Sequence, residues 1–106
     1  MELDDLIVYH RGDFRRYADA KLGLLTHAVL YGTGCFEGIR AFWNDDHGEL
    51  YVFEPSAHFR RLHNSAKLLL MELAEGPERL AAILADTPPD PAWAVDLRRM
   101  RDEDRY

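Results

Sequence analysis

The chemistry that this sequence could perform is concentrated in one extended segment, where an aromatic ring, a glycine and an arginine occur at alternate positions. These residues are Phe36, Gly38 and Arg40. Successive side chains of a strand point to opposite faces, so the three share one face. A flat ligand could lie over the gap at Gly38, beside the ring of Phe36, while Arg40 binds a carboxylate through two parallel hydrogen bonds. The pattern also fits a bulge at Gly38 with a solvated Arg40, and alone it favours that simpler interpretation.

A second candidate is a group of basic side chains on a predicted helix. Arg61 and Ser65 are four residues apart and share one helix face. An arginine fork matches the oxygens of a phosphate, so this pair could bind one. A solvated basic face is the alternative, and the pattern alone favours it. His58 and His63 are five residues apart, off the spacing at which two helical histidines bind one metal ion, so we predict no metal site.

Two hairpins are predicted to come before the helix. Strand-forming runs at residues 6–10 and 14–17 flank the turn Arg11-Gly12-Asp13. After the glycine bend at Gly32-Thr33-Gly34, residues 35–43 and 49–53 flank a cluster of turn residues and form a second hairpin.

Two helices are predicted to follow. Pro55 suits the first turn of a helix, and an apolar stripe then recurs at spacings of three and four: Phe59, Leu62, Ala66, Leu69 and Leu73. Gly76-Pro77 interrupts that pattern, and residues 78–84 form a shorter helix. The order predicts an α+β fold with two small hairpins, or one antiparallel sheet, packed with one long and one shorter helix.

Length, composition and charge limit the class of protein. The chain has 106 residues, a net charge of −6 and one cysteine, Cys35, which cannot form an internal disulfide. We expect one domain in a reducing compartment, over residues 1–87, followed by a charged, disordered tail over 88–106. No basic stripe for nucleic acid, no signal peptide and no membrane span is visible, so a cytoplasmic protein with small-molecule partners is predicted.

Taken together, these segments resemble the branched-chain amino-acid aminotransferases, fold-type IV enzymes that use pyridoxal 5′-phosphate. Residues 26–42, THAVLYGTGCFEGIRAF, resemble the family's THALHYGTGVFEGIRAY region, and residues 58–67, HFRRLHNSAK, resemble its HxxRLxxSAK segment. Asp19-Ala20-Lys21 matches its EDAKV stretch, and the resemblance runs in register over residues 6–73. D-amino-acid aminotransferases and aminodeoxychorismate lyases more often have GDG-[FVY]-[YF]-E where this chain has GTGCFE, which favours the branched-chain branch.

The resemblance implies roles for the matching residues. Arg61 matches the arginine that binds the cofactor phosphate, and the substrate pocket of the family matches Tyr31, Phe36, Gly38 and Arg40. Arg40 would lie near the acidic side chain of the glutamate co-substrate. The implied reaction is transamination of leucine, isoleucine or valine with 2-oxoglutarate, in a homo-oligomeric enzyme whose small N-terminal domain this chain represents incompletely.

The two lysines depart from what this chemistry needs. Transamination with this cofactor requires a Schiff-base lysine, which the family carries in its second, larger domain. Lys21 and Lys67 are the only lysines of the chain, and both match non-catalytic family positions. We therefore expect an aminotransferase fragment, inactive by itself and without a catalytic residue. Two alternatives remain: a non-catalytic small domain that serves for dimerisation or binding, and another fold-type IV enzyme.

Overall fold

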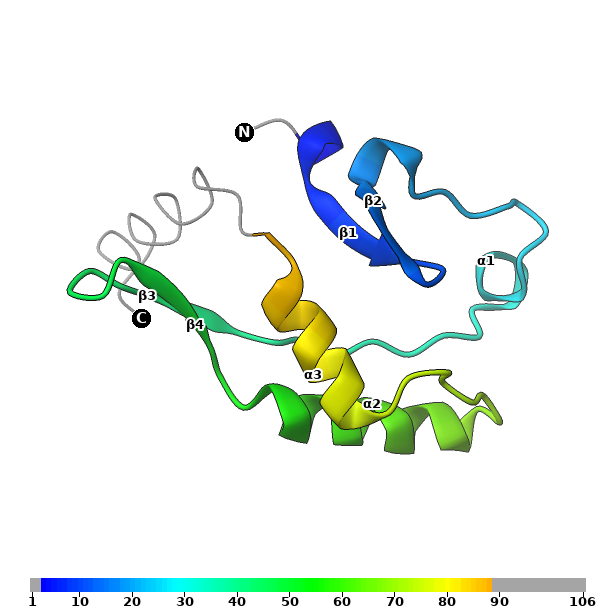
Figure 1. The fold of residues 1–106 in the computed structure, drawn as a ribbon. Coiled ribbons are helices and arrows are strands. Elements are labelled where there is room, and N and C mark those ends of the chain that lie inside the picture. The colour runs from blue at the N-terminus through cyan, green and yellow to red at the C-terminus, as the bar shows by residue number, and fades with distance from the viewer. Residues whose placement is uncertain (1–2, 89–106) are drawn as a thin grey trace, which may run out of the picture.

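The computed structural model describes residues 3–88, which form two hairpins and a pair of packed helices (Figure 1). In chain order the elements are the 3-10 turn η1 (Leu3–Asp5), strands β1 (Ile7–His10) and β2 (Asp13–Arg16), the 3-10 turn η2 (Tyr17–Asp19), helix α1 (His27–Tyr31), strands β3 (Ala41–Asn44) and β4 (Glu49–Val52), and helices α2 (Pro55–Leu68) and α3 (Pro77–Asp86). The predicted α+β class is confirmed, with two separate two-stranded sheets rather than one. Of the predicted tail over 88–106, all but Pro88 lies outside the described residues.

The first hairpin closes through a two-residue turn. Antiparallel pairing runs from Ile7 opposite Arg16 to His10 opposite Asp13, as the sequence predicts. Arg11 and Gly12 form the turn with φ angles of 55° and 87°. Positive φ at both central residues gives the turn a twist that matches the flanking strands, and glycine adopts such angles without strain.

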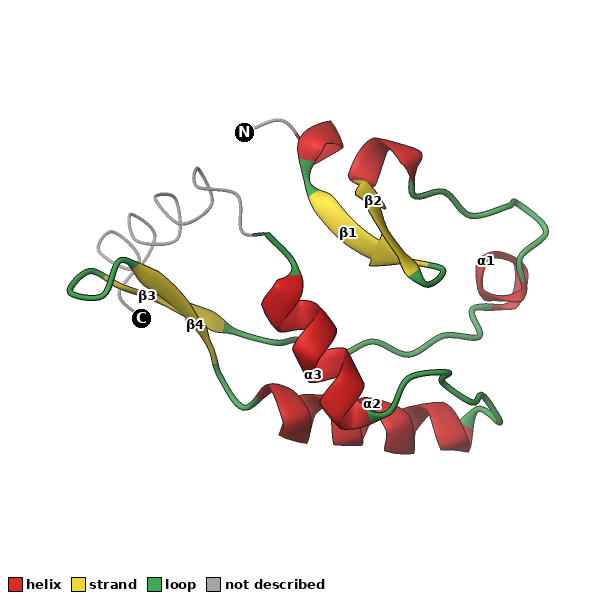
Figure 2. Cartoon of the chain, viewed as in Figure 1, coloured by secondary structure: helices red, strands yellow, loops and turns green. Residues whose placement is uncertain are grey.

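The second hairpin is shorter than predicted. β3 begins at Ala41 and pairs with β4 from Ala41 opposite Val52 to Asn44 opposite Glu49, whereas the sequence suggested a strand from Cys35. A strand requires a backbone partner, and β3 and β4 pair only with each other among residues 3–88. Residues 35–40 are therefore drawn as a loop in Figure 2, joined to the hairpin where the Phe53 amide donates to the Arg40 carbonyl at 2.8 Å.

Helix α2 begins at Pro55 as predicted, but it ends before the apolar stripe does. The chain turns at Leu70, whose φ of 59° is left-handed, and the amides of Leu69 and Met71 both donate to the carbonyl of Ala66. Leu69 and Leu73 therefore lie outside the helix, contrary to the predicted stripe. Pro77 occupies the first turn of α3, where its missing amide hydrogen costs no helical hydrogen bond.

The buried core lies where α2 and α3 pack against each other. Ala66 on α2 and Ile83 on α3 are the two buried apolar residues of the described chain. The first hairpin is tied to the loop between these helices, because the Tyr9 hydroxyl donates to Glu75 Oε1 at 3.3 Å. Among residues 3–88, no helix is long and apolar enough to cross a membrane.

Candidate functional site

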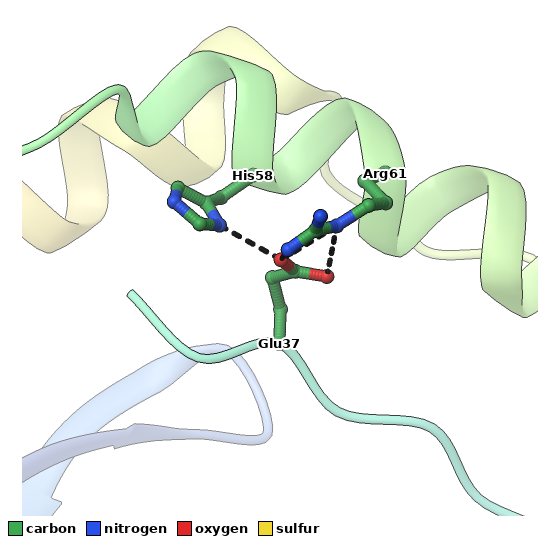
Figure 3. A network of polar contacts seen from close by, with 3 residues as sticks. All are labelled: Glu37, His58 and Arg61. Atoms are coloured by element: carbon green, nitrogen blue, oxygen red, sulfur yellow. Dashed lines mark hydrogen bonds and ion pairs between the residues drawn. The ribbon is translucent and has the colours of Figure 1, made fainter. Parts of the chain in front are cut away.

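A carboxylate with three donors forms the centre of the candidate site (Figure 3). Oε1 of Glu37 lies 2.7 Å from Nδ1 of His58 and accepts from Nε of Arg61 at 2.8 Å. Oε2 lies 3.1 Å from the same Nε, and Nη2 of Arg61 also donates to Oε1. An ionised carboxylate only accepts hydrogen bonds, so His58 carries its hydrogen on Nδ1. The Glu37 side chain is only 7% exposed.

Two elements bring these groups together. His58 and Arg61 are three residues apart on α2 and so share one face of the helix. Glu37 reaches that face from the extended segment 35–40. Along this segment the even-numbered residues are exposed and the odd-numbered ones half-buried, which is the alternation of an extended chain. This alternation turns Glu37 towards α2 and leaves its neighbours on the other side.

The same contacts fix the charge of the cluster. Hydrogen bonds from Arg61 and then from His58 lower the pKa of Glu37 from 4.5 to about 2, against a smaller opposing effect of burial. The reciprocal interaction raises the pKa of Arg61. Both groups are therefore ionised near neutral pH, and the cluster is a charge-assisted pair with a histidine as a third member.

Arg61 keeps one edge of its guanidinium available. Glu37 takes the side edge, formed by Nε and Nη2, while the end edge, formed by Nη1 and the second hydrogen of Nη2, has no partner among residues 3–88. The Arg61 side chain is 67% exposed, and beside it lies a hollow of about 200 Å³. The hollow is lined by Glu54, Ala57, His58 and Arg61. A phosphate fits this arrangement, because the end edge alone offers two parallel donors to its oxygens.

The predicted substrate residues form an open face. Phe36 is 90% exposed, Arg40 is exposed, and a Cβ added at Gly38 would meet no atom within 4 Å. The side chain of Arg40 makes no hydrogen bond or ion pair within residues 3–88. The expected face of Phe36, Gly38 and Arg40 thus exists, and the gap at Gly38 is unfilled.

The structure does not join all predicted site residues into one cluster. Tyr31, at the end of α1, is 73% exposed and contacts the ring of His27, with ring centroids 4.7 Å apart. No hydrogen bond links Arg61 to Tyr31, to Arg40 or to its predicted partner Ser65 within the described chain. Glu37, one position from both Phe36 and Gly38, is the residue that connects the open face to Arg61.

Sequence reasoning missed Glu37 and His58. Glu37 received no role because a carboxylate on the second face of a strand has no visible partner 24 residues away. The sequence did place Glu37 on the same face as Cys35 and Ile39, and a carboxylate between two apolar side chains was the one available signal. His58 and His63 bind different groups, since Nε2 of His63 lies 2.8 Å from the Glu75 carbonyl. Residues 3–88 hold no group of three or more His, Cys, Asp or Glu side chains placed to bind a metal ion.

A larger hollow lies elsewhere in the molecule. Its volume is about 610 Å³, between the second hairpin and the end of α3. It is lined mainly by apolar side chains, such as those of Trp43, Leu50 and Leu84, and includes none of the predicted site residues. Its polar lining residues are Glu49, Tyr51 and Thr87, and it contains no cationic side chain to bind a phosphate, whereas the hollow beside Arg61 does.

Known proteins similar to this chain agree on one family, although no family model matches. The chain is 42% identical over 65 residues to a probable branched-chain-amino-acid aminotransferase of Aquifex aeolicus, covering 61% of this chain and 21% of that protein. It is 35% identical over 79 residues to the branched-chain-amino-acid aminotransferase of Escherichia coli strain K12, covering 74% and 25%. The chain thus spans about a quarter of the length of the curated relatives it matches.

Solved structures give the same result. The branched-chain aminotransferase of Thermoproteus uzoniensis, determined with norvaline, superposes with a TM-score of 0.67 at 37% identity, over 72% of this chain and 25% of that one. The Escherichia coli enzyme superposes with a TM-score of 0.63 at 35% identity, over 73% and 24%.

In both fold and sequence, the described residues match part of a fold-type IV aminotransferase. More narrowly, the chain belongs with the branched-chain amino-acid aminotransferases and corresponds to about a quarter of such a protein.

Proposed function

We propose that this chain supplies the phosphate-binding helix and part of the substrate wall of a pyridoxal-phosphate-dependent branched-chain aminotransferase. The observation that carries the proposal is the guanidinium of Arg61, held on one edge by Glu37 and open on the other beside a hollow. The reaction would exchange an amino group between leucine, isoleucine or valine and 2-oxoglutarate, in a homo-oligomer as the family resemblance implies.

The cofactor would provide the electron sink for reaction at the α-carbon of the amino acid. This chain's own contribution is binding. The end edge of Arg61 would hold the phosphate, which anchors the cofactor away from the reacting atoms. The hollow beside Arg61 is lined by residues of the first turn of α2, and the N-terminal end of a helix favours an anion.

The open face would bind substrate. Phe36 offers apolar ring surface for an aliphatic side chain, the empty space at Gly38 leaves room for the ligand, and the exposed ring of Tyr31, at the end of α1, would add apolar surface from outside this face. Arg40, without an ion-pair partner among residues 3–88, would bind the side-chain carboxylate of glutamate or 2-oxoglutarate. The norvaline in the Thermoproteus uzoniensis structure is an aliphatic amino acid, which supports this assignment of substrate class.

Neither lysine of this chain would transfer a proton in the reaction. Lys67 lies exposed near the end of α2 and Lys21 precedes α1, and neither makes a hydrogen bond or ion pair with the site residues. The chain alone should therefore catalyse no transamination. Treated with pyridoxal phosphate and borohydride, it should give no specific lysine adduct by mass spectrometry. A stoichiometric adduct at Lys67 would require the roles to be reassigned.

The direct test uses pyridoxamine 5′-phosphate, which resembles the cofactor but cannot couple to lysines. Calorimetry should show that the chain binds it more tightly than pyridoxamine, which lacks the phosphate. Arg61→Ala should abolish that difference. The matched control is Arg60→Ala on the same helix, whose guanidinium is exposed and lies 3.9 Å from Glu78 instead. Equal binding of both ligands, or equal loss in both variants, would contradict the proposed function.

A further inference from the structure

Arg61 would be a poor anion receptor without help. Its side chain is long, it is 67% exposed, and free rotation would have to stop when an anion binds. Ordering such a side chain opposes binding, and a group that orders it beforehand removes that cost. Within residues 3–88, the Arg61 guanidinium hydrogen-bonds to one group, the carboxylate of Glu37.

The geometry of that contact leaves the anion-binding edge free. Glu37 receives only the hydrogens of the side edge, so two parallel donors on the end edge stay available. A carboxylate on the end edge would have competed with an anion, whereas one on the side edge fixes the plane of the guanidinium. His58 holds the carboxylate in turn through its Nδ1, 2.7 Å away.

The side chain of Glu37 is itself restricted by burial. Its side chain is 7% exposed although it lies on a segment without a strand partner. In the close view of the cluster, Glu37 extends from the extended segment to His58 and Arg61 on α2 (Figure 3). The neighbours Phe36 and Gly38 lie on the open face, so the position of Glu37 also relates that face to Arg61.

We propose that Glu37 is a positioning residue, which together with His58 orients Arg61 so that its free edge receives a phosphate or phosphomonoester. The inference rests on the proposed function of Arg61 and deepens it. Electrostatics alone predicts that removing a negative charge beside an anion site tightens anion binding. If Glu37 orients Arg61, removing the charge of Glu37 weakens phosphate binding instead.

The experiment measures inorganic phosphate binding to the whole chain by ³¹P NMR, with the wild type and the variants Glu37→Gln, Glu54→Gln and Arg61→Ala. Glu37→Gln should weaken phosphate binding roughly five-fold, because it replaces a charge-assisted pair by a neutral contact. Glu54→Gln is the matched control, since Glu54 lines the same hollow and makes no hydrogen bond to Arg61. It removes the same charge and should leave binding unchanged or slightly tighter.

A second readout separates positioning from a general loss of structure. In ¹⁵N spectra without phosphate, the Arg61 Nε–H resonance should be distinct in the wild type and in Glu54→Gln, and should move to the random-coil position in Glu37→Gln. Amide shifts of α3 should stay unchanged in all variants.

The outcomes separate the two claims. Unchanged or tighter phosphate binding in Glu37→Gln, with binding lost in Arg61→Ala, would overturn the positioning role and leave the proposed function standing. An Arg61 Nε–H resonance already at the random-coil position in the wild type would overturn the positioning role as well. Binding that survives Arg61→Ala, or no phosphate binding by the wild type, would overturn the proposed function and the positioning role with it.

Discussion

The helix pair, α2 with α3, and the wall segment, residues 22–40, differ in how far their apolar side chains are buried. The helix pair contains both buried apolar residues of the described chain, Ala66 and Ile83. The wall segment exposes its large apolar side chains, with Leu25 at 86% and Phe36 at 90%. Exposed apolar patches of this kind mark surfaces that meet a ligand or another protein surface. The helix pair therefore contains the buried core of the described residues, whereas the exposed wall segment is the surface to which we propose that substrate binds.

The largest difference between the two regions should appear when the core of the helix pair is truncated. Ile83→Ala should lower the free energy of unfolding by about 2–5 kcal/mol, because it deletes buried methyl groups and leaves a cavity. Leu25→Ala, in the wall segment, is the matched control and should change it by less than about 0.5 kcal/mol. Urea unfolding followed by circular dichroism measures both. Equal losses would show that the wall segment belongs to the core.

Two glycines of the wall segment should respond differently to alanine. Gly32 caps α1 with a φ of 68°, so Gly32→Ala should cost about 1–2 kcal/mol of unfolding free energy. Gly38 has no positive φ, and an alanine Cβ there meets no atom. Gly38→Ala should therefore leave the free energy of unfolding unchanged or slightly higher. A clear destabilisation by Gly38→Ala in urea titrations would show that its space is filled by the chain itself rather than kept for a ligand.

The contact between the two regions should respond to acid. The pKa of Glu37 is 4.5 ordinarily and about 2 in the folded chain, so the folded state binds fewer protons than the unfolded state between these values. The stability that the cluster contributes is therefore complete above pH 4.5 and is lost as the pH falls towards 2. Because the cluster is partly solvated, the effect should be modest. The difference in urea midpoint between the wild type and Glu37→Gln should shrink over this pH range, and a constant difference would contradict the ionised pair.

The smallest expected effect is at the end of α2. Leu70 adopts a φ of 59° and is 95% exposed, so its side chain gains little from packing while its backbone is strained. Leu70→Gly should raise the free energy of unfolding by about 0.5 kcal/mol, once the greater freedom of glycine in the unfolded chain is counted. Thermal unfolding detects such a change. A loss of stability would mean that Leu70 packs against something in solution.

The sequence predicted those features that depend on local chemistry. Alternation placed Phe36, Gly38 and Arg40 on one face, and Pro55 marked the start of α2. The sequence did not predict features that depend on contacts between residues far apart in the chain. Periodicity extended the strand back to Cys35 because an alternating pattern does not reveal that no partner strand lies beside it. Likewise, no local signal joins Glu37 to Arg61, since folding alone brings the two residues together.

The measurement that tests the central claim most directly is the mapping of chemical-shift changes on the whole chain with pyridoxamine 5′-phosphate. The largest changes should fall on the Arg61 side chain and on the amides of the first turns of α2. Smaller changes should reach Glu37 and Gly38, and the amides of residues 22–25 should not move. Changes centred on residues 22–31 with α2 undisturbed would contradict a phosphate site on the helix pair.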